Sequence, residues 1–265
     1  MSVLFEACVD SVASAVAAVA GGAARLELCE GLVEGGLTPS LGKLETVLAA
    51  VPGVPVHVLV RPRGGDFCYS PVEVAAMVRD IEVCGAAGAA GVVLGVLLPD
   101  GRLDEPCMQA LVAVARASGL LVTLHRAVDV SCDAVEAALA GARLGVDFIL
   151  SSGAAATALQ GAATLAAMGA ALRAASSASS SPAPALIAAA GVTPENVAAI
   201  VRLSGVRQVH GTAREPGFTP GAMTFAKAPP LYMGGEKVNT PQAEAGLRLA
   251  TVSSVRAVTD ALKGL

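Results

Sequence analysis

Apolar and polar positions follow two different periods along the chain. Apolar runs of six to eight residues, rich in Val and Ala, alternate with stretches in which apolar residues return every three or four positions. Short apolar runs are typical of buried strands, and the longer period is typical of amphipathic helices. The pattern predicts strands at residues 3–9, 24–29, 55–61, 91–98, 120–127, 147–152, 184–190 and 207–212. It predicts helices at residues 11–20, 40–51, 71–84, 105–118, 133–144, 155–175, 194–203 and 241–263.

Eight strand–helix units in succession indicate a parallel sheet joined by right-handed crossovers. Eight is also the strand number at which such a sheet closes on itself. We therefore predict an α/β protein with a single-domain (β/α)8 TIM barrel over residues 1–265. A doubly wound open sheet is the alternative. It does not need an eighth strand, and the first turn, at Asp10-Ser11, lacks a glycine-rich dinucleotide-binding motif.

Two segments interrupt the strand–helix repeat. Residues 174–184 contain Ser-Ser-Ala-Ser-Ser-Ser-Pro and are predicted to form a flexible connection into the seventh strand, on the barrel face opposite the catalytic one. Residues 211–240 show no clear periodicity and are predicted to form a long loop between the eighth strand and the last helix. A loop of this length can cover the mouth of the barrel.

Composition and charge narrow the class of partner. Hydrophobic residues make up 54% of the chain, the formal net charge is −4, and no run of Lys or Arg occurs. These features argue against a nucleic-acid or membrane partner and favour a small molecule or an ion. The first 22 residues have no basic segment typical of a secretory signal, and residues 154–172 fit a packed helix better than a membrane span. Six cysteines without such a signal predict reduced thiols in the cytoplasm.

A Glu-x-Cys pattern ends each of the first two predicted strands. Glu6 and Cys8 share one face of the first strand, and Glu27 and Cys29 share one face of the second, because side chains alternate along a strand. Neighbouring strands lie about 4.8 Å apart, so thiols at matched heights can bind one ion. Soft thiolates favour Cu(I), which makes Cys8 and Cys29 the candidate metal ligands. The alternative is that both are small buried core residues.

The densest group of chemically active side chains lies between residues 61 and 70, after the third predicted strand. This loop carries Arg61, Arg63 and Asp66 together with two glycines. Strand parity places His125 and His210 at the same barrel mouth. Carboxylates beside guanidinium groups stay ionised, and an imidazole between them can move a proton. The alternative is a set of ion pairs that closes the polar end of the barrel.

These residues define two candidate site assignments. A small anionic ligand is expected to contact Arg61, Arg63, Ser152 and His210. If the protein is an enzyme, its expected catalytic residues are Glu6, His125, Arg61 and Asp66. His57 lies lower on the third strand and is expected to be structural, as are the remaining four cysteines.

The sequence resembles the CutC family of copper homeostasis proteins. The resemblance is carried by Glu6 with Cys8, Glu27-Leu28-Cys29, Glu34-Gly35-Gly36-Leu37-Thr38-Pro39-Ser40, the stretch from Arg61 to Ser70, Thr123 with His125-Arg126-Ala127 and Asp129, Ser152-Gly153, and His210 with Ala213. It implies a TIM barrel, a cytoplasmic setting and a homo-oligomer, either dimer or tetramer. It also implies copper ion binding, with Cys8 and Cys29 as the Cu(I) ligands. The resemblance implies no particular reaction.

Three functions therefore stay open at the level of sequence. The first is copper homeostasis through Cu(I) binding at the two thiols. The second is an enzyme, such as a lyase, isomerase or hydrolase, that acts on a small anionic metabolite at the Arg/Glu/His cluster. The third is a non-catalytic oligomeric scaffold.

Overall fold

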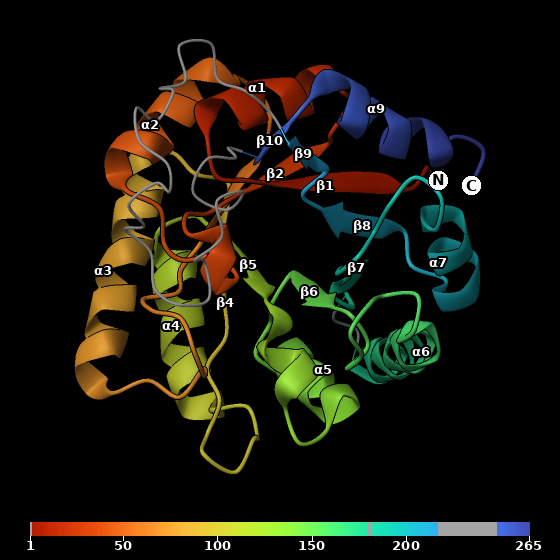
Figure 1. Ribbon diagram of the computed structural model, residues 1–265. Helices are drawn as coiled ribbons and strands as arrows, with labels where there is room; N and C mark the ends of the chain where they lie inside the picture. The colour runs from red at the N-terminus through yellow and green to blue at the C-terminus, as the bar shows by residue number, and fades with distance from the viewer. Residues whose placement is uncertain (1, 180–181, 217–247) are drawn as a thin grey trace, which may run out of the picture.

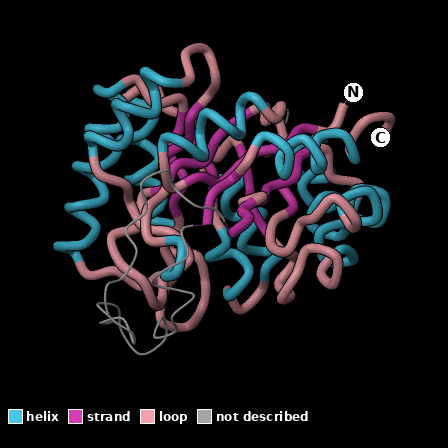
Figure 2. Tube along the Cα trace, turned by 45° about the horizontal axis from the view of Figure 1, so that its top comes forward, coloured by secondary structure: helices cyan, strands magenta, loops and turns pink. Residues whose placement is uncertain are grey.

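The protein is an eight-stranded parallel barrel surrounded by helices, as its computed structural model shows over residues 2–179, 182–216 and 248–265 (Figures 1 and 2). The strands are hydrogen-bonded in sequence order and the last pairs with the first, so the sheet closes. The predicted TIM barrel is confirmed. The strands are β1 (Leu4–Val9), β2 (Arg25–Leu28), β3 (Val56–Leu59), β4 (Gly91–Leu94), β5 (Leu121–Leu124), β6 (Phe148–Ser151), β7 (Ala185–Ala188) and β8 (Gln208–Gly211).

A helix follows each strand and packs on the outside of the barrel (Figure 1). Local capping fixes where several of them begin. Ser70 caps the third helix by accepting from the backbone N–H of Glu73, whose carboxylate accepts in return from the Ser70 N–H, and Pro71 occupies the first turn. The helices are α1 (Val12–Ala20), α2 (Leu41–Ala50), α3 (Pro71–Ala87), α4 (Glu105–Ala117), α5 (Ala134–Arg143), α6 (Ala162–Ser179), α7 (Val197–Ser204) and α9 (Val252–Ala261), with 3₁₀ turns η1 (Leu32–Glu34) and η2 (Arg126–Val130).

The two irregular segments differ in part from their predictions. Helix α6 continues to Ser179, so residues 174–179 of the predicted flexible connection are helical. Alanine is the strongest helix former, and serine adds only a small cost inside a helix. Residues 214–216 of the predicted long loop form β9 (Arg214–Pro216), which pairs antiparallel with β10 (Arg248–Ala250). Strand β10 lies inside the segment predicted as the last helix, and the helix itself begins only at Val252. Residues 180–181 and 217–240 of these two predictions lie outside the described residues.

Because side chains alternate along the strands, one set packs between the sheet and the helices and the other set points into the barrel. Leu26 and Leu28 on β2 are fully buried against the helices and belong to the main hydrophobic core. Glu27, the residue between them, points to the barrel axis, where other polar groups are also buried. Among the described residues, no helix is both long enough and apolar enough to cross a bilayer. The fold therefore places its polar chemistry inside the barrel, between a lower end at the amino ends of the strands and a mouth at their carboxyl ends.

Candidate functional site

A cavity of about 440 Å³ opens at the carboxyl end of the barrel. Its wall is built from the last residues of the strands and from the loops that follow them, the usual place for a site in this fold. Apolar side chains such as Leu59 and Phe67 form part of the wall. The chemically active residues that line the cavity are Cys8, Glu27, Glu34, Arg61, His125, Arg126 and His210.

The two predicted copper ligands lie next to each other in this cavity region. The sulfur atoms of Cys8 and Cys29 are 3.7 Å apart, and both thiols are free and buried. Their heights are not matched, because Cys8 pairs in register with Glu27 and Cys29 lies beyond the end of β2. The stagger of the strands thus sets the Cys of the first Glu-x-Cys pattern level with the Glu of the second. The two sulfur atoms therefore approach each other diagonally across the strands. Leu59 and Val93 pack around them and keep the pair in apolar surroundings.

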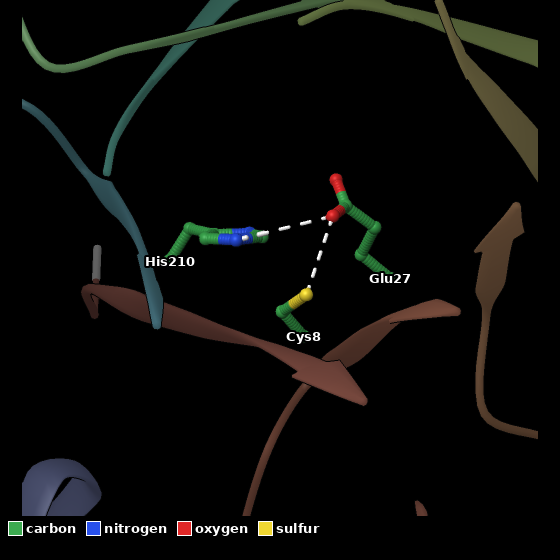
Figure 3. A group of neighbouring side chains, drawn as sticks. All are labelled: Cys8, Glu27 and His210. Atoms are coloured by element: carbon green, nitrogen blue, oxygen red, sulfur yellow. Dashed lines mark hydrogen bonds and ion pairs between the residues drawn. The ribbon is translucent and has the colours of Figure 1, made fainter. Parts of the chain in front are cut away.

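Cys8, Glu27 and His210 form a compact group whose potential ligand atoms lie within 4.8 Å of one another. The thiol and the imidazole point toward the same carboxylate oxygen (Figure 3). Cys8 Sγ donates to Glu27 Oε1 at 3.4 Å, and His210 Nε2 lies 4.0 Å from that oxygen. A thiol, an imidazole and a carboxylate are all metal-binding groups, so the donor set fits a metal ion.

Glu6 lies one layer below this group and holds His210 in place. Its Oε1 is 2.7 Å from His210 Nδ1, and its Oε2 accepts from Arg25 Nε. Arg25 also donates to Gln208 Oε1 at 2.8 Å. A carboxylate on Nδ1 orients the imidazole so that Nε2 faces the mouth, an arrangement common behind metal-binding histidines. Both oxygens of Glu6 are thus engaged, and Glu6 does not line the mouth cavity, so its predicted catalytic role stays a prediction.

Neighbouring charged groups determine the pKa values of Glu6 and His210. Burial alone raises the pKa of Glu6, but the hydrogen bond and charge of His210 and the charge of Arg25 bring it down to about 2. Burial alone lowers the pKa of His210, but the negative charge of Glu27 and the hydrogen bond to Glu6 raise it above its usual value. Glu6 is thus a permanent anion at neutral pH, and it stabilises a proton on His210.

The acidic groups in the upper layer, Cys8 and Glu27, have raised pKa values. The hydrogen bond with the neighbouring Cys29, burial and the nearby Glu27 together raise the pKa of the Cys8 thiol well above its usual value. Burial also raises the pKa of Glu27, partly offset by the charge of His210. A metal ion that binds here therefore displaces a proton from Cys8, since the thiolate is the ligand form.

Arg61 lies in the wall of the cavity at the end of β3 and is 7% exposed. Its Nη1 donates to the backbone carbonyls of Glu34 and Gly36 at 2.7 and 2.9 Å, and its Nη2 donates to that of Gly65 at 3.0 Å. Its Nε is buried without a partner among the described residues. Arg61 thus organises the two loops that carry the Glu34 and Gly65 carbonyls while it keeps one donor free.

His125 follows β5 and is 5% exposed. Its Nδ1 accepts from the Ala127 backbone N–H at 3.2 Å, and its Nε2 has no partner in the described part of the chain. Burial, together with the positive charge of Arg61, lowers the pKa of His125 to about 3, so the ring is neutral at pH 7. Gly95 on the neighbouring strand end makes room for the ring, since a Cβ there would lie 2.6 Å from His125 Nδ1.

Three other predicted residues do not line the cavity. Arg63 pairs with Glu73 at 2.6 Å and with Asp66 at 3.0 Å. The side chain of Asp66 is 69% exposed and also accepts from the Cys68 N–H. Ser152 is fully buried and uses its hydroxyl on the Ala155 carbonyl at 2.7 Å. These contacts stabilise the loops, and the structure does not bring Arg63, Asp66 and Ser152 together with the other site residues.

Sequence reasoning placed Glu27 and His210 at the mouth but gave neither a role at the metal. Their roles depend on the barrel register, which sets Cys8 opposite Glu27 and Glu6 opposite His210. The supporting role of Gly95 was also missed. Its one available sign in the sequence is a glycine directly after an otherwise apolar strand run, where close approach of another side chain is a common reason.

Comparison with known proteins identifies the family. The model of the CutC family matches residues 3–215. A CutC family protein of Bacteroides fragilis is 44% identical over 212 residues, 80% of each chain. A relative of Mus musculus described as a copper homeostasis protein cutC homolog is 41% identical over 211 residues, 80% of this chain and 74% of the relative.

Solved structures agree with this result. A crystal structure of the copper homeostasis protein CutC from Streptococcus agalactiae superposes with a TM-score of 0.72 at 27% identity, covering 79% of this chain and 98% of that one. A thiamine phosphate pyrophosphorylase from Pyrococcus furiosus, with a TM-score of 0.51 at 16% identity and coverage of 98% and 96%, shares the fold alone. The barrel, the extent of the match and the identity to these relatives together show that the chain belongs to the CutC family.

Proposed function

We propose that this protein binds Cu(I) through Cys8 and Cys29 and serves copper homeostasis. The observation that carries the proposal is the distance of 3.7 Å between the two sulfur atoms. Two metal–sulfur bonds of about 2.3 Å can span that distance, so both thiols can reach one ion without a change of backbone. The ring of His210, held by Glu6, offers a nitrogen within 4.8 Å of the Cys8 sulfur as a third ligand.

The surroundings favour a soft monovalent ion. The thiol pair lies among Leu59 and Val93, and both sulfurs are buried. Thiolates select Cu(I) over harder cations, and a buried, apolar site keeps water away from the ion. Zn(II) is the chemical competitor, since it also accepts thiolate, imidazole and carboxylate ligands.

The test is a Cu(I) titration of the wild type and of a Cys8→Ser/Cys29→Ser double variant under reducing conditions. A Cys107→Ser/Cys132→Ser variant is the matched control, because it removes the same number of thiols from half-buried and exposed positions. We expect one tightly bound Cu(I) in the wild type and the control and none in the site variant. Equal stoichiometry and affinity in all three proteins, or a stronger preference for Zn(II), contradicts the proposal.

The cytoplasmic setting and the homo-oligomer form part of the same proposal. Free thiols in all six cysteines suit a reducing compartment, where disulfides are rare. Light scattering coupled to size-exclusion chromatography measures whether the protein is a dimer or a tetramer, and a strictly monomeric mass removes this part of the proposal.

A second candidate function is catalysis on a small anionic metabolite. It is favoured by the position of His125 and Arg61 in the wall of one cavity, with Glu27 as the nearest buried carboxyl group that also lines it. Incubation with a library of phosphorylated and carboxylate metabolites, followed by mass spectrometry, tests for turnover. A product that forms with the wild type and not with a His125→Asn variant supports this function, and the absence of any conversion counts against it.

A further inference from the structure

Three residues that line the mouth cavity each carry a buried side-chain atom without a hydrogen-bond partner within the described residues. The three atoms are Glu27 Oε2, Arg61 Nε and His125 Nε2. Native proteins pair the large majority of buried polar atoms, so an unpaired group asks for a specific explanation. Glu27 belongs to the proposed copper site, where its other oxygen accepts from the Cys8 thiol. Arg61 and His125 lie outside that site and need a different explanation.

We propose that Arg61 and His125 form an oxyanion subsite that binds the carboxylate or phosphate group of a small metabolite. Arg61 follows β3 and His125 follows β5, whereas the proposed copper ligands belong to β1, the end of β2 and β8. The subsite is therefore a separate part of the cavity wall and does not depend on copper binding.

Both unpaired atoms are hydrogen-bond donors. The Nε of a guanidinium group always carries a hydrogen. His125 Nδ1 accepts from the Ala127 N–H, so it carries no hydrogen, and the single proton of the neutral ring is on Nε2. Two donors and no acceptor require an acceptor ligand, and a carboxylate or phosphate supplies at least two oxygens.

Phe67 brings the two donors into one neighbourhood. Its ring centroid lies 4.9 Å from that of His125, and the central guanidinium carbon of Arg61 lies 5.1 Å from the same Phe67 ring. Gly95, which lacks a Cβ, leaves room for the imidazole. The donors are therefore held by packing before a ligand arrives, which lowers the entropy cost of binding.

The local charge also favours an anion. Arg61 donates only to backbone carbonyls and has no carboxylate partner within the described residues, so its charge is uncompensated. The other cavity arginine, Arg126, is paired with Asp129 at 2.8 Å. The exposed Glu34 is the acidic group at the rim on this side, where solvent screens its charge.

The experiment measures binding of inorganic phosphate and of malonate to the metal-free protein by isothermal titration calorimetry. We expect saturable binding of at least one probe in the presence of a copper chelator. Preference for phosphate identifies a phosphorylated metabolite, and preference for malonate identifies a carboxylate. If neither probe binds saturably, the proposal is overturned, whatever the copper titration gives.

Two substitutions of His125 separate its donor from its structural role. His125→Asn keeps an acceptor near the Ala127 N–H but removes the Nε2 donor, so affinity should fall about tenfold or more with an unchanged unfolding midpoint. His125→Gln restores a donor near the Nε2 position and loses the acceptor, so affinity should stay within about threefold while stability falls. Wild-type affinity in His125→Asn overturns the proposal.

Two charge variants control for general electrostatics. Glu34→Gln removes the rim carboxylate beside the subsite and should tighten anion binding severalfold. Arg79→Gln removes a positive charge from an exposed ion pair on α3, with 73% of the Arg79 side chain accessible, and should leave affinity unchanged. An equal loss of affinity in Arg79→Gln and His125→Asn indicates non-specific attraction and overturns the subsite.

Discussion

The two ends of the barrel interior differ in how completely their buried polar groups are hydrogen-bonded. The lower end also encloses a cavity, of about 270 Å³, but its polar side chains are bonded to one another. Arg25 donates to Glu6 and Gln208 and lies 4.3 Å from the centre of the Phe148 ring. At the mouth, by contrast, buried donor and acceptor atoms lack partners in the described structure.

This difference separates stability from function. A self-satisfied network contributes to folding and has no hydrogen-bonding capacity left for a ligand, whereas unpaired buried groups cost stability until a ligand binds. Substitutions at the lower end should therefore reduce the free energy of unfolding and spare binding. Substitutions that remove an unpaired donor at the mouth, such as His125→Asn, should instead reduce binding and spare the free energy of unfolding.

The largest expected effect is at Arg25. Replacement by Met removes the guanidinium from Glu6, which is 2% exposed, and leaves the Gln208 amide oxygen without its donor. Loss of one partner of a buried ion pair costs about 3–5 kcal/mol. Urea unfolding should show a loss of that size, with anion binding at the mouth within about twofold of wild type. Arg79→Met, at an exposed ion pair, is the control and should change stability by less than about 0.5 kcal/mol. Similar losses in the two variants would mean that the lower network does not stabilise the fold.

The next largest effect is a loss of stability at acidic pH, which we expect from His57, also in the lower half of the barrel. Burial lowers the pKa of His57 to about 4, aided by the charge of Arg25 and opposed by Glu6. The unfolded chain takes up a proton near pH 6.5 while the native ring stays neutral, so stability is full above pH 6.5 and falls toward pH 4. The contribution amounts to about 3 kcal/mol by pH 4. In His57→Gln, which keeps a polar group near Thr123, the decline between pH 6.5 and pH 4 should be shallower by that amount. Parallel curves for the two proteins refute the assignment.

The sequence predicted the barrel from its succession of strand–helix units, and it placed Cys8 and Cys29 on inward strand faces from local alternation. Inside and outside positions follow from the two-residue period of a strand, as the contrast between Leu26 and Glu27 shows. The closure of the sheet followed from the count of eight strand–helix units. The closure needed no knowledge of how the strands are shifted against each other. The proposed meeting of the thiols assumed matched heights, whereas in the structure Cys8 is level with Glu27 and the two sulfurs approach diagonally.

The sequence does not predict the register between neighbouring strands or the direction that the chain takes after each strand ends. The Cys8–Glu27–His210 group exists because the stagger of the barrel sets Cys8 level with Glu27. No local pattern encodes that shift. Arg63 and Asp66 lie beyond the end of β3, where alternation stops, and they turn to each other and to Glu73.

Copper binding at the mouth should depend on pH. The pKa of the Cys8 thiol is raised by its hydrogen bond with Cys29, by burial and by the nearby Glu27, so Cu(I) must displace its proton at pH 7. Each proton released makes the apparent affinity rise about tenfold per pH unit, or about 1.4 kcal/mol. Competition with a colorimetric Cu(I) chelator at pH 6, 7 and 8 measures this slope. An affinity that does not vary with pH contradicts binding by the Cys8 thiolate.

The smallest effect concerns backbone strain, which is also confined to the mouth. Ala154, Ala190 and Ala213 are the described non-glycine residues with positive φ, and they follow β6, β7 and β8. The positive φ of 80° at Ala190 costs about 1–2 kcal/mol of folded-state stability. Glycine adopts this conformation with little strain, but it has a higher conformational entropy in the unfolded state, which offsets part of the gain. Ala190→Gly should therefore raise the free energy of unfolding by up to about 1 kcal/mol. Ala189→Gly, at the preceding residue without positive φ, should lower it by about 0.5–1 kcal/mol. If both glycines destabilise the protein equally, the mouth stores no strain at Ala190, and its difference from the lower end is limited to the unpaired polar atoms.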